Sequence, residues 1–347
     1  MNEEFELPEL IGDGSVESEL YEHHRIVADK GQGLLRIDKF LMSRIENASR
    51  NKIQQAAKAG NILVNNIPVK QNYRIKPLDI VSIVMTYPPR LNEIIPQEIP
   101  LNIVYEDNHL VVINKEAGLV VHPGHGNWDG TLVNALLWHF EDSGHKEMAP
   151  LLVHRIDKDT SGIMIVAKTE EAQSRLARNF FDHTIERTYQ AIVWGVPKAT
   201  EGTITGHIGR NLSNRLMMAV FPSGDHGKHA ITHYRVLKDL SYISLLECKL
   251  ETGRTHQIRA HLKYIGHPLF NDERYGGDKI LRGTTSGAYK KFVEDCFNIL
   301  PRQALHAKSL GFIHPITKEK MFFNSELPND MSTLIAKWEN LIMNRQQ

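Results

Sequence analysis

The chain has 347 residues, which is enough for a sizeable core and for two domains. Its composition, 41% hydrophobic and 24% charged, is that of an ordinary globular protein. No apolar run reaches membrane-spanning length, and the acidic N-terminus is unlike a secretory signal peptide. Two cysteines, Cys248 and Cys296, cannot build a disulfide framework. These features argue against a membrane protein and a disulfide-rich secreted protein, and they predict a location in the reducing cytoplasm.

The formal net charge of zero conceals two blocks of opposite sign. Residues 1–30 carry nine acidic and two basic side chains, whereas residues 31–76 carry nine basic and two acidic ones. We therefore predict an acidic, mostly disordered leader over residues 1–31, followed by a basic module. A role for the leader in screening the basic module is less favoured than that of a solvating tail.

Residues 32–85 predict one small α/β domain. Apolar residues at helical spacing indicate a first helix: Ile37, Phe40, Leu41 and Ile45. Ser49 is a good N-cap for a second helix over residues 50–59, and Gly60 is a good residue to end it. An Asn65-Asn66 turn indicates a hairpin. The predicted strands cover residues 62–64, 67–69 and 80–84.

Basic side chains decorate these two helices, and a surplus of positive charge on one module is the electrostatic footprint of nucleic-acid binding. RNA or DNA binding is therefore favoured over two merely solvated helix faces. The pattern Arg-x-Asp-Lys-Phe-Leu, then Asn-Lys-Ile-Gln and Gly-x-Ile-x-Val-Asn, resembles the small RNA-binding domain named after ribosomal protein S4. The side chains expected to contact RNA are Arg36, Lys39, Arg50, Lys52 and Lys58.

Four prolines within residues 86–100 predict an extended linker. A second domain is expected over residues 101–347. Its predicted strands cover residues 103–107, 110–113, 162–167, 186–195 and a segment that ends at Thr252-Gly253. Its predicted helices begin at Thr131 and Thr169, carry His256 to Leu262, and cover residues 289–299 and 331–343.

Within that domain, VHRIDKDTSGIMIVAK at residues 153–168 places a charged segment before a buried strand. Charged groups at the mouth of a buried strand are costly unless they pair or take part in chemistry. Arg155 and Asp157 are two positions apart, so in an extended segment they would share a face. A guanidinium there would keep the carboxylate ionised, as suits a nucleophile. The plainer interpretation, an ordinary salt-bridged turn, is weakened by the hydroxyls and glycine at residues 160–162.

The stretch HRIDKDTSG at residues 154–162 resembles the signature of the RluA/RluD family of pseudouridine synthases. Two further stretches are family-like, Tyr-Glu-Asp…Asn-Lys-x-x-Gly-x-x-x-His-Pro from residue 105 and Thr-Gly-Arg-Thr-His-Gln-Ile-Arg from residue 252. The family's Lys-x-Tyr-x-Ala motif is present with Arg187 in place of the lysine, and Glu116 replaces a usual proline. The resemblance spans about residues 32–325.

The resemblance implies that the protein isomerises uridine to pseudouridine in folded RNA, without a metal or organic cofactor. It implies an α+β fold whose second domain has a mixed, largely antiparallel sheet. The catalytic residues it assigns are Asp157, Tyr189 and Arg259, with Arg259 beside Asp157. Substrate contacts are expected from His154, Arg155, Lys158, Thr160, Arg254 and His256. Large-subunit ribosomal RNA is the family-based target, transfer RNA is the alternative, and a monomer is expected.

Several alternatives remain on residues alone. Basic groups at helical spacing from His256 suit an anion such as phosphate, whereas a metal site is disfavoured because this helix has no cysteine or carboxylate. A non-catalytic RNA-binding or assembly protein is a second class, and a glycosidase, which would need two carboxylates, is a third. Asp157 could attack the sugar or abstract a sugar proton.

Overall fold

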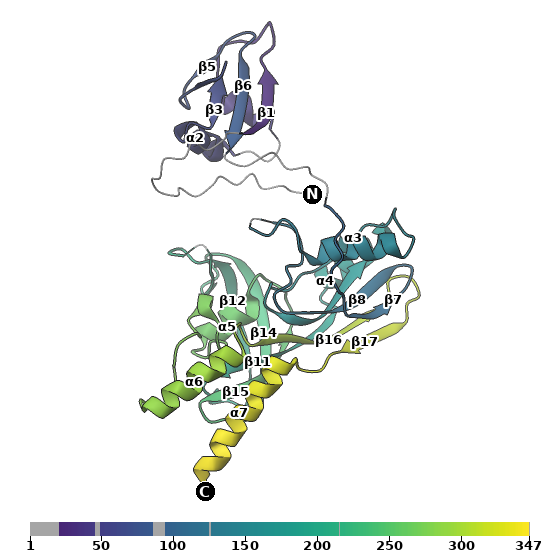
Figure 1. Cartoon of the computed structure of the whole chain (residues 1–347), viewed down its shortest axis with the longest axis vertical. Coiled ribbons are helices and arrows are strands. Elements are labelled where there is room, and N and C mark those ends of the chain that lie inside the picture. The colour runs from purple at the N-terminus through teal and green to yellow at the C-terminus, as the bar shows by residue number, and fades with distance from the viewer. Residues whose placement is uncertain (1–20, 46–48, 86–93, 125, 215, 347) are drawn as a thin grey trace. The chain divides into compact units, whose positions relative to one another are not determined.

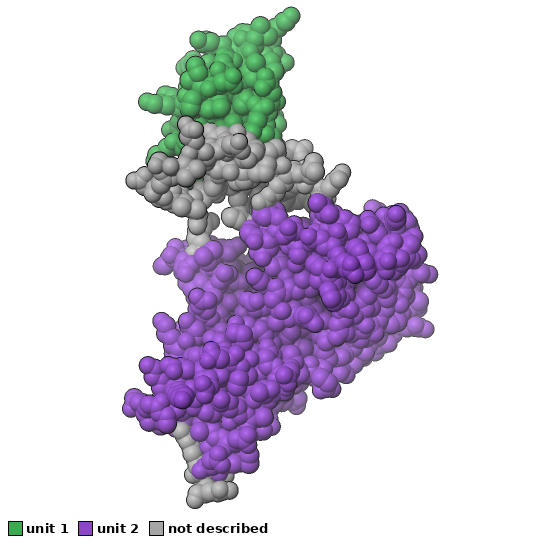
Figure 2. All heavy atoms as spheres, viewed as in Figure 1, with its two compact units in different colours: residues 1–93 green, residues 94–347 purple. Residues whose placement is uncertain are grey.

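The computed structural model describes residues 21–45, 49–85, 94–124, 126–214 and 216–346 (Figure 1). The chain divides into two compact units, residues 1–93 and 94–347, and each has its own hydrophobic core (Figure 2). Residues 1–20 of the predicted leader and residues 86–93 of the predicted linker lie outside the described residues. No helix in the described part is long and apolar enough to cross a membrane.

The first unit is a small α/β domain. Its described elements are β1 (Tyr21–Val27), β2 (Leu35–Arg36), α1 (Ile37–Met42), α2 (Arg50–Lys58), β3 (Ile62–Val64), β4 (Ile67–Pro68), β5 (Arg74–Ile75) and β6 (Ile80–Met85). Antiparallel strands form a sheet in the order β1-β6-β3-β4, and β2 pairs with β5. Phe40 and Leu41 from α1 and Ile53 from α2 are buried in its core. The apolar spacing that predicted the first helix is confirmed for Ile37, Phe40 and Leu41, whereas Ile45 follows the end of α1.

Local side-chain signals set the ends of these elements as predicted. The Ser49 hydroxyl accepts the backbone N–H of Lys52 at 3.3 Å, which caps α2. Asn65 and Asn66 have φ angles of 49° and 67°. A two-residue hairpin turn needs both residues in this left-handed region, which asparagine tolerates better than most residues.

Residues 21–27 correct the predicted leader, because they form β1 rather than disordered chain. The strand pairs antiparallel with β6, from Val27 opposite Ile80 to Tyr21 opposite Met85. Ile26 packs against the core of the unit. An edge strand satisfies its backbone on one side and can keep polar side chains, so its composition is close to that of a solvated tail.

The second unit is built on one large sheet flanked by helices (Figure 1). Its described strands are β7 (Ile103–Glu106), β8 (Leu110–Lys115), β9 (Leu151–Leu152), β10 (Ser161–Ala167), β11 (Glu186–Trp194), β12 (Glu201–Arg210), β13 (Met218–Phe221), β14 (Lys228–Leu240), β15 (Ile243–Leu250), β16 (Leu305–Ile313) and β17 (Lys320–Asn324). Its described helices are α3 (Leu132–Asp142), α4 (Glu170–Phe181), α5 (Gln257–Tyr264), the short 3-10 helix η1 (Glu273–Tyr275), α6 (Gly287–Ile299) and α7 (Asn329–Gln346).

The strand order is β13-β12-β14-β15-β11-β16-β10-β8-β7, with β17 beside β16 and β9 beside β10. Among the described strands, β10 and β16 form the one parallel pair, and the other pairs are antiparallel. The predicted mixed, largely antiparallel sheet is therefore confirmed.

Strand β10 is buried along its whole length because helices cover both of its faces. Met164 and Val166 join a core cluster with residues of α3 and α5. Ile163 and Ile165 point the other way, into a cluster with residues of α4. This position explains the continuous apolar run in the sequence.

The start of β10 is pressed closely against β16. Gly162 has a φ of 116°, and a Cβ atom there would lie 2.2 Å from the carbonyl oxygen of Ala307. Only glycine fits this approach. It fixes the segment immediately before β10, where the charged residues of the signature lie.

Candidate active site

A turn of residues 157–160 precedes β10, and the backbone N–H of Thr160 closes it by donating to the carbonyl of Asp157 at 3.1 Å. Two buried cations hold its other carbonyls. The Lys115 ammonium donates to the carbonyl of Lys158 at 2.8 Å. The Arg302 guanidinium donates to the carbonyl of Asp159 at 2.9 Å. Lys115 is the last residue of β8, and Arg302 lies three residues before the start of β16. The turn is thus fixed by residues at the ends of two strands of the same sheet.

Lys115 is almost completely buried at the end of β8. Its Nζ also donates to the carbonyls of Glu116 at 2.7 Å and Leu119 at 2.8 Å. Burial lowers the pKa of Lys115 to about 7, although the negative charge of Asp159 opposes this shift. Three acceptors match the three N–H groups of the ammonium form.

Arg302 is anchored from the opposite side by α7. Its guanidinium donates to both carboxylate oxygens of Asp330, at 2.7 and 3.0 Å. Its Nη2 also lies 3.4 Å from the hydroxyl of Ser161 at the start of β10. The terminal helix therefore supports the turn through one arginine.

Asp157 lies against α5, as the resemblance implies. Arg259 Nη1 donates to Asp157 Oδ2 at 2.8 Å. The same guanidinium binds Asp272 through Nε and Nη2, both at 2.8 Å. Burial acts to lower the pKa of Arg259, but the hydrogen bonds and charge of Asp272, reinforced by Asp157, raise it. A permanently charged arginine, itself held by a second carboxylate, orients Asp157.

His256 lies on the other side of the same carboxylate oxygen. Its Nε2 is 3.9 Å from Asp157 Oδ2, and its Nδ1 is 3.0 Å from the Tyr275 hydroxyl. Burial lowers the pKa of His256 to about 4 and raises that of Tyr275 to about 12. The Tyr275 hydroxyl accepts the backbone N–H of Met218 at 2.9 Å, and its own proton is available to His256 Nδ1. In the tautomer in which Nδ1 accepts that proton, the neutral imidazole carries its hydrogen on Nε2, which faces Asp157.

Tyr189 lies on β11 beside an open pocket of about 440 Å³. Burial, and to a smaller extent the charge of Asp157, raises the pKa of Tyr189, whereas Arg187 opposes the shift. The phenol is therefore protonated at neutral pH. The pocket combines basic, aromatic and apolar side chains, among them Arg155, Phe180, Arg187, Leu250 and Arg254.

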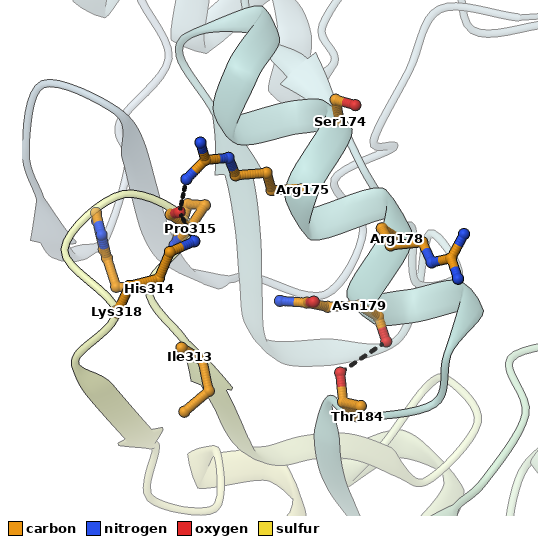
Figure 3. A pocket seen from close by; sticks show the side chains of 9 residues that line it. All are labelled: Ser174, Arg175, Arg178, Asn179, Thr184, Ile313, His314, Pro315 and Lys318. Carbon is orange, nitrogen blue, oxygen red and sulfur yellow. Dashed lines mark hydrogen bonds between the residues drawn. The ribbon is translucent and has the colours of Figure 1, made fainter.

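A larger pocket of about 640 Å³ contains none of the predicted site residues (Figure 3). It lies between α4 and the turn after β16. Its Arg175 donates to the carbonyl of Pro315 at 2.7 Å, and its Arg178 pairs with Asp182 at 2.6 Å. Size alone does not identify the active site, because the residues that line this pocket include no carboxylate.

Arg155 corrects the prediction that it pairs with Asp157. It is exposed and lines the pocket beside Tyr189, and no ion pair between Arg155 and Asp157 occurs among the described residues. Residues 154–157 are not part of a strand, and the hydrogen-bonded turn begins at Asp157. The partner is Arg259, 102 residues further along the chain.

The remaining predicted contacts differ in their availability. Arg254 lines the pocket, and its Nε donates to the carbonyl of His229 at 3.1 Å. His154 also lines the pocket, but its Nε2 accepts the backbone N–H of Ile165 at 3.0 Å. Lys158 is exposed and Thr160 is buried.

The predicted anion site on α5 is not assembled as expected. His256 precedes the helix with a φ of 52°, so the helix does not carry it. His261 is buried and bonds the Thr232 hydroxyl at 2.9 Å. The Arg259 guanidinium already pairs with two carboxylates, those of Asp157 and Asp272. No group of three or more potential metal ligands occurs in the described part of the chain.

Residues that were not singled out complete the site, namely Lys115, Asp272, Tyr275 and Arg302. Of these, Lys115 falls in the family-like stretch that begins at residue 105. Their roles were invisible in the sequence because each acts across a long-range contact.

In the first unit, the five predicted RNA contacts are not equivalent. Asp38 is fully buried, and its carboxylate accepts hydrogen bonds from Arg36 at 3.0 Å and Arg50 at 3.1 Å. Burial opposes ionisation of Asp38, but Gln54 and the two arginines lower its pKa to about 2. Lys39 and Lys58 are exposed, and Lys52 is half-buried.

Comparison with known proteins agrees with this arrangement. Residues 109–264 match the RNA pseudouridylate synthase family, and residues 35–81 match the S4 domain. An uncharacterised RNA pseudouridine synthase of Chlorobaculum parvum is 48% identical over 89% of this chain and 95% of its own length. Ribosomal large subunit pseudouridine synthase D of Zymomonas mobilis is 45% identical over 86% of this chain and 92% of its own length.

Among solved structures, human RNA pseudouridylate synthase domain containing 4 is similar, with a TM-score of 0.56 and 25% identity. The similarity covers 69% of this chain and 93% of the human one. Together with the relatives and the carboxylate beside a buried arginine, this shows that the chain belongs to the RluA-type RNA pseudouridine synthases with an N-terminal S4 domain.

Proposed function

We propose that this enzyme converts specific uridines of large-subunit ribosomal RNA to pseudouridine, with Asp157 as the essential catalytic carboxylate. The observation that carries the proposal is the position of Asp157, held by Arg259 at 2.8 Å near a pocket that contains Tyr189. The ribosomal target rests on relatives named large-subunit synthases, such as that of Zymomonas mobilis at 45% identity. The predicted cytoplasmic location and monomeric state remain predictions.

The reaction breaks the bond between uracil N1 and the sugar, turns the base, and joins its C5 to the same sugar carbon. N1 gains a proton and C5 loses one, so the reaction needs no outside oxidant, reductant or second substrate. A carboxylate can attack the sugar as a nucleophile or abstract a sugar proton. Among the described residues, Arg259 and His256 both approach the Asp157 carboxylate at Oδ2, which leaves Oδ1 for either task.

The pocket residues suit the other requirements of the reaction. Tyr189 can stack on the base or take part in moving the C5 proton. A base inside folded RNA must leave its stack to react, and exposed Arg155 at the pocket can fill the gap it leaves.

The test is a map of pseudouridines in RNA from cells that lack this protein. We expect particular positions in large-subunit ribosomal RNA to become unmodified and to return with the wild-type gene. The gene carrying Asp157→Asn should not restore them. Loss of positions in transfer RNA instead would replace the proposed target, and an unchanged map would contradict the proposed function.

A further inference from the structure

Arg187 on β11 is a buried cation, and none of the carboxylates in the described residues forms an ion pair with it. Only 7% of the residue is exposed, and its Nε has no hydrogen-bond partner. Burial lowers its pKa.

Two other buried arginines of this protein are each paired with a carboxylate. Arg259 is 6% exposed and binds Asp272 through two nitrogens. Arg302 is 9% exposed and binds Asp330 in the same way. An unpaired buried charge is destabilising, so a cation without a carboxylate partner at the edge of a pocket suits an anion from outside the chain.

The Arg187 guanidinium is surrounded by Phe180, Gly253 and the pocket that contains Tyr189. The guanidinium lies over the ring of Phe180, with Cζ 5.3 Å from the ring centre. A Cβ atom at Gly253 would come within 2.7 Å of its Nη1, so the absence of a side chain at Gly253 makes room for the guanidinium itself. Arg187 lines the same pocket as Tyr189, two residues further along β11 and therefore on the same face of the strand.

We propose that Arg187 binds an RNA phosphodiester group next to the target uridine. The proposal rests on the proposed function. It adds that the part of the pocket around Arg187 binds the RNA backbone beside the target uridine. Phosphodiesters are the permanent anions of RNA, and a guanidinium forms strong, charge-assisted hydrogen bonds with them. Arg155 and Arg254 line the same pocket and add to its positive field. Tyr189 then faces the base while Arg187 holds the adjoining backbone.

The first test replaces Arg187 in the full-length enzyme with glutamine, which removes the charge and keeps a polar side chain. The melting temperature of the RNA-free enzyme should stay level or rise, because an unpaired buried charge is removed. Affinity for a large-subunit RNA fragment containing the mapped uridine should fall roughly tenfold or more. The salt dependence of log K should become shallower by about 0.7–0.9, as for one lost phosphate contact.

Arg187→Lys and Arg235→Gln are the matched controls. Lysine keeps the charge and should restore the salt dependence. Arg235 is exposed on β14 and pairs with Glu247 at 2.8 Å, so its loss should leave affinity unchanged. A clear fall in melting temperature for Arg187→Gln, with unchanged salt dependence, would mean that Arg187 is a structural residue and would overturn the proposal.

The second test identifies the phosphate. Each phosphodiester flanking the target uridine is replaced, one at a time, by a neutral methylphosphonate. The wild-type enzyme should lose affinity at one position, and Arg187→Gln should lose nothing further there. If no position is coupled to Arg187 and only kcat falls, the guanidinium serves the detached base, and the phosphate assignment is wrong.

Product formation by the wild-type enzyme on the unmodified fragment is measured in parallel. A wild-type enzyme that turns over but shows no coupling contradicts the Arg187 assignment alone. A wild-type enzyme that binds the fragment but forms no pseudouridine contradicts the proposed function, whatever the coupling.

Discussion

At the scale of single residues, Arg259 serves two carboxylates with different surroundings. Asp272 is 1% exposed and holds the guanidinium through two hydrogen bonds, whereas the partly exposed Asp157 takes one. The firmer contact fixes the arginine, and the arginine then orients the reactive group. The two carboxylates should therefore separate stability from catalysis.

Asp157→Asn should abolish pseudouridine formation with little effect on the melting temperature. Asparagine keeps the size and hydrogen-bonding capacity of the side chain but loses its charge and basicity. Arg259 remains paired with Asp272, so no buried cation is left alone. Thermal unfolding beside a pseudouridine assay gives product per folded enzyme. Near-normal turnover by the folded variant would falsify the catalytic assignment.

Asp272→Asn should instead destabilise the enzyme by roughly 3–5 kcal/mol, because it removes the main partner of a buried arginine. Activity should also fall, since Arg259 no longer holds Asp157 in one position. Denaturant unfolding of the two variants side by side makes the comparison. Equal stabilities for Asp157→Asn and Asp272→Asn would show that the bidentate contact does not anchor the site.

At the scale of elements, the catalytic turn is held by groups that lie far from it in sequence. The local signals of the chain were sufficient to predict the buried strand β10 and the helix cap at Ser49. They could not reveal that Lys115 and Arg302 hold consecutive carbonyls of the turn. Periodicity and capping reside in neighbouring residues, whereas these contacts depend on the order of strands in the sheet.

The same distinction explains the wrong partner for Asp157. An extended segment would have placed Arg155 beside it, but Arg155 is exposed at the pocket while Asp157 pairs with Arg259. Strand β1 was missed for another reason, since an edge strand needs few apolar residues. The family resemblance named Arg259 correctly because the motif carries long-range information that composition does not.

Lys115→Met tests the support of the turn. Methionine fills similar space but removes the ammonium that donates to the carbonyls of Glu116, Leu119 and Lys158, which should cost roughly 1–3 kcal/mol. We expect kcat to fall while the affinity for RNA is nearly unchanged, because Lys115 touches the turn and not the pocket. Steady-state kinetics on the RNA fragment check this. A variant with an unchanged kcat would show that the turn keeps its shape without this clamp.

At the scale of the whole molecule, the S4 domain is the unit with the surplus of basic residues, but not all of them are available to bind RNA. Arg36 and Arg50 are engaged by buried Asp38. Lys39 and Lys58 are exposed and free to approach phosphates. Counting charges from the sequence therefore overstates the number of available cations.

Deletion of residues 1–93 should leave the second unit folded, since it has its own core clusters. RNA affinity should fall, and the slope of log K against log salt should decrease by roughly 0.7–0.9 for each lost phosphate contact. Titrations at several salt concentrations measure the slope. If the truncated enzyme keeps the full slope, the S4 domain does not bind the RNA backbone.

Acid should destabilise the catalytic unit before its carboxylates are protonated. Burial lowers the pKa of His256, His261 and His306 to about 4, and that of His154 to about 3. In the unfolded chain, histidine pKa values are near 6.5. Between about pH 4 and pH 6.5 the unfolded chain therefore binds more protons than the folded chain. The stability that depends on these neutral histidines is therefore fully present above about pH 6.5 and is lost as the pH falls toward 4, by about 1.4 kcal/mol per pH unit for each histidine.

Unfolding free energies measured from pH 7 to pH 4 check this dependence, and His261→Asn should reduce the slope by one proton. A flat profile across this range would mean that the histidines are already protonated in the folded enzyme.

The parallel pairing of β10 with β16 also governs when the enzyme becomes competent during its synthesis. Ser161 lies opposite His306, and the turn before it needs Arg302. Closing so long a loop is entropically costly and slow compared with local contacts. During synthesis, Asp157 is therefore made long before Arg302 and β16, which are needed to assemble the active site. Products terminated ahead of β16 would carry the S4 domain and the whole HRIDKDTSG signature, and would still be inert.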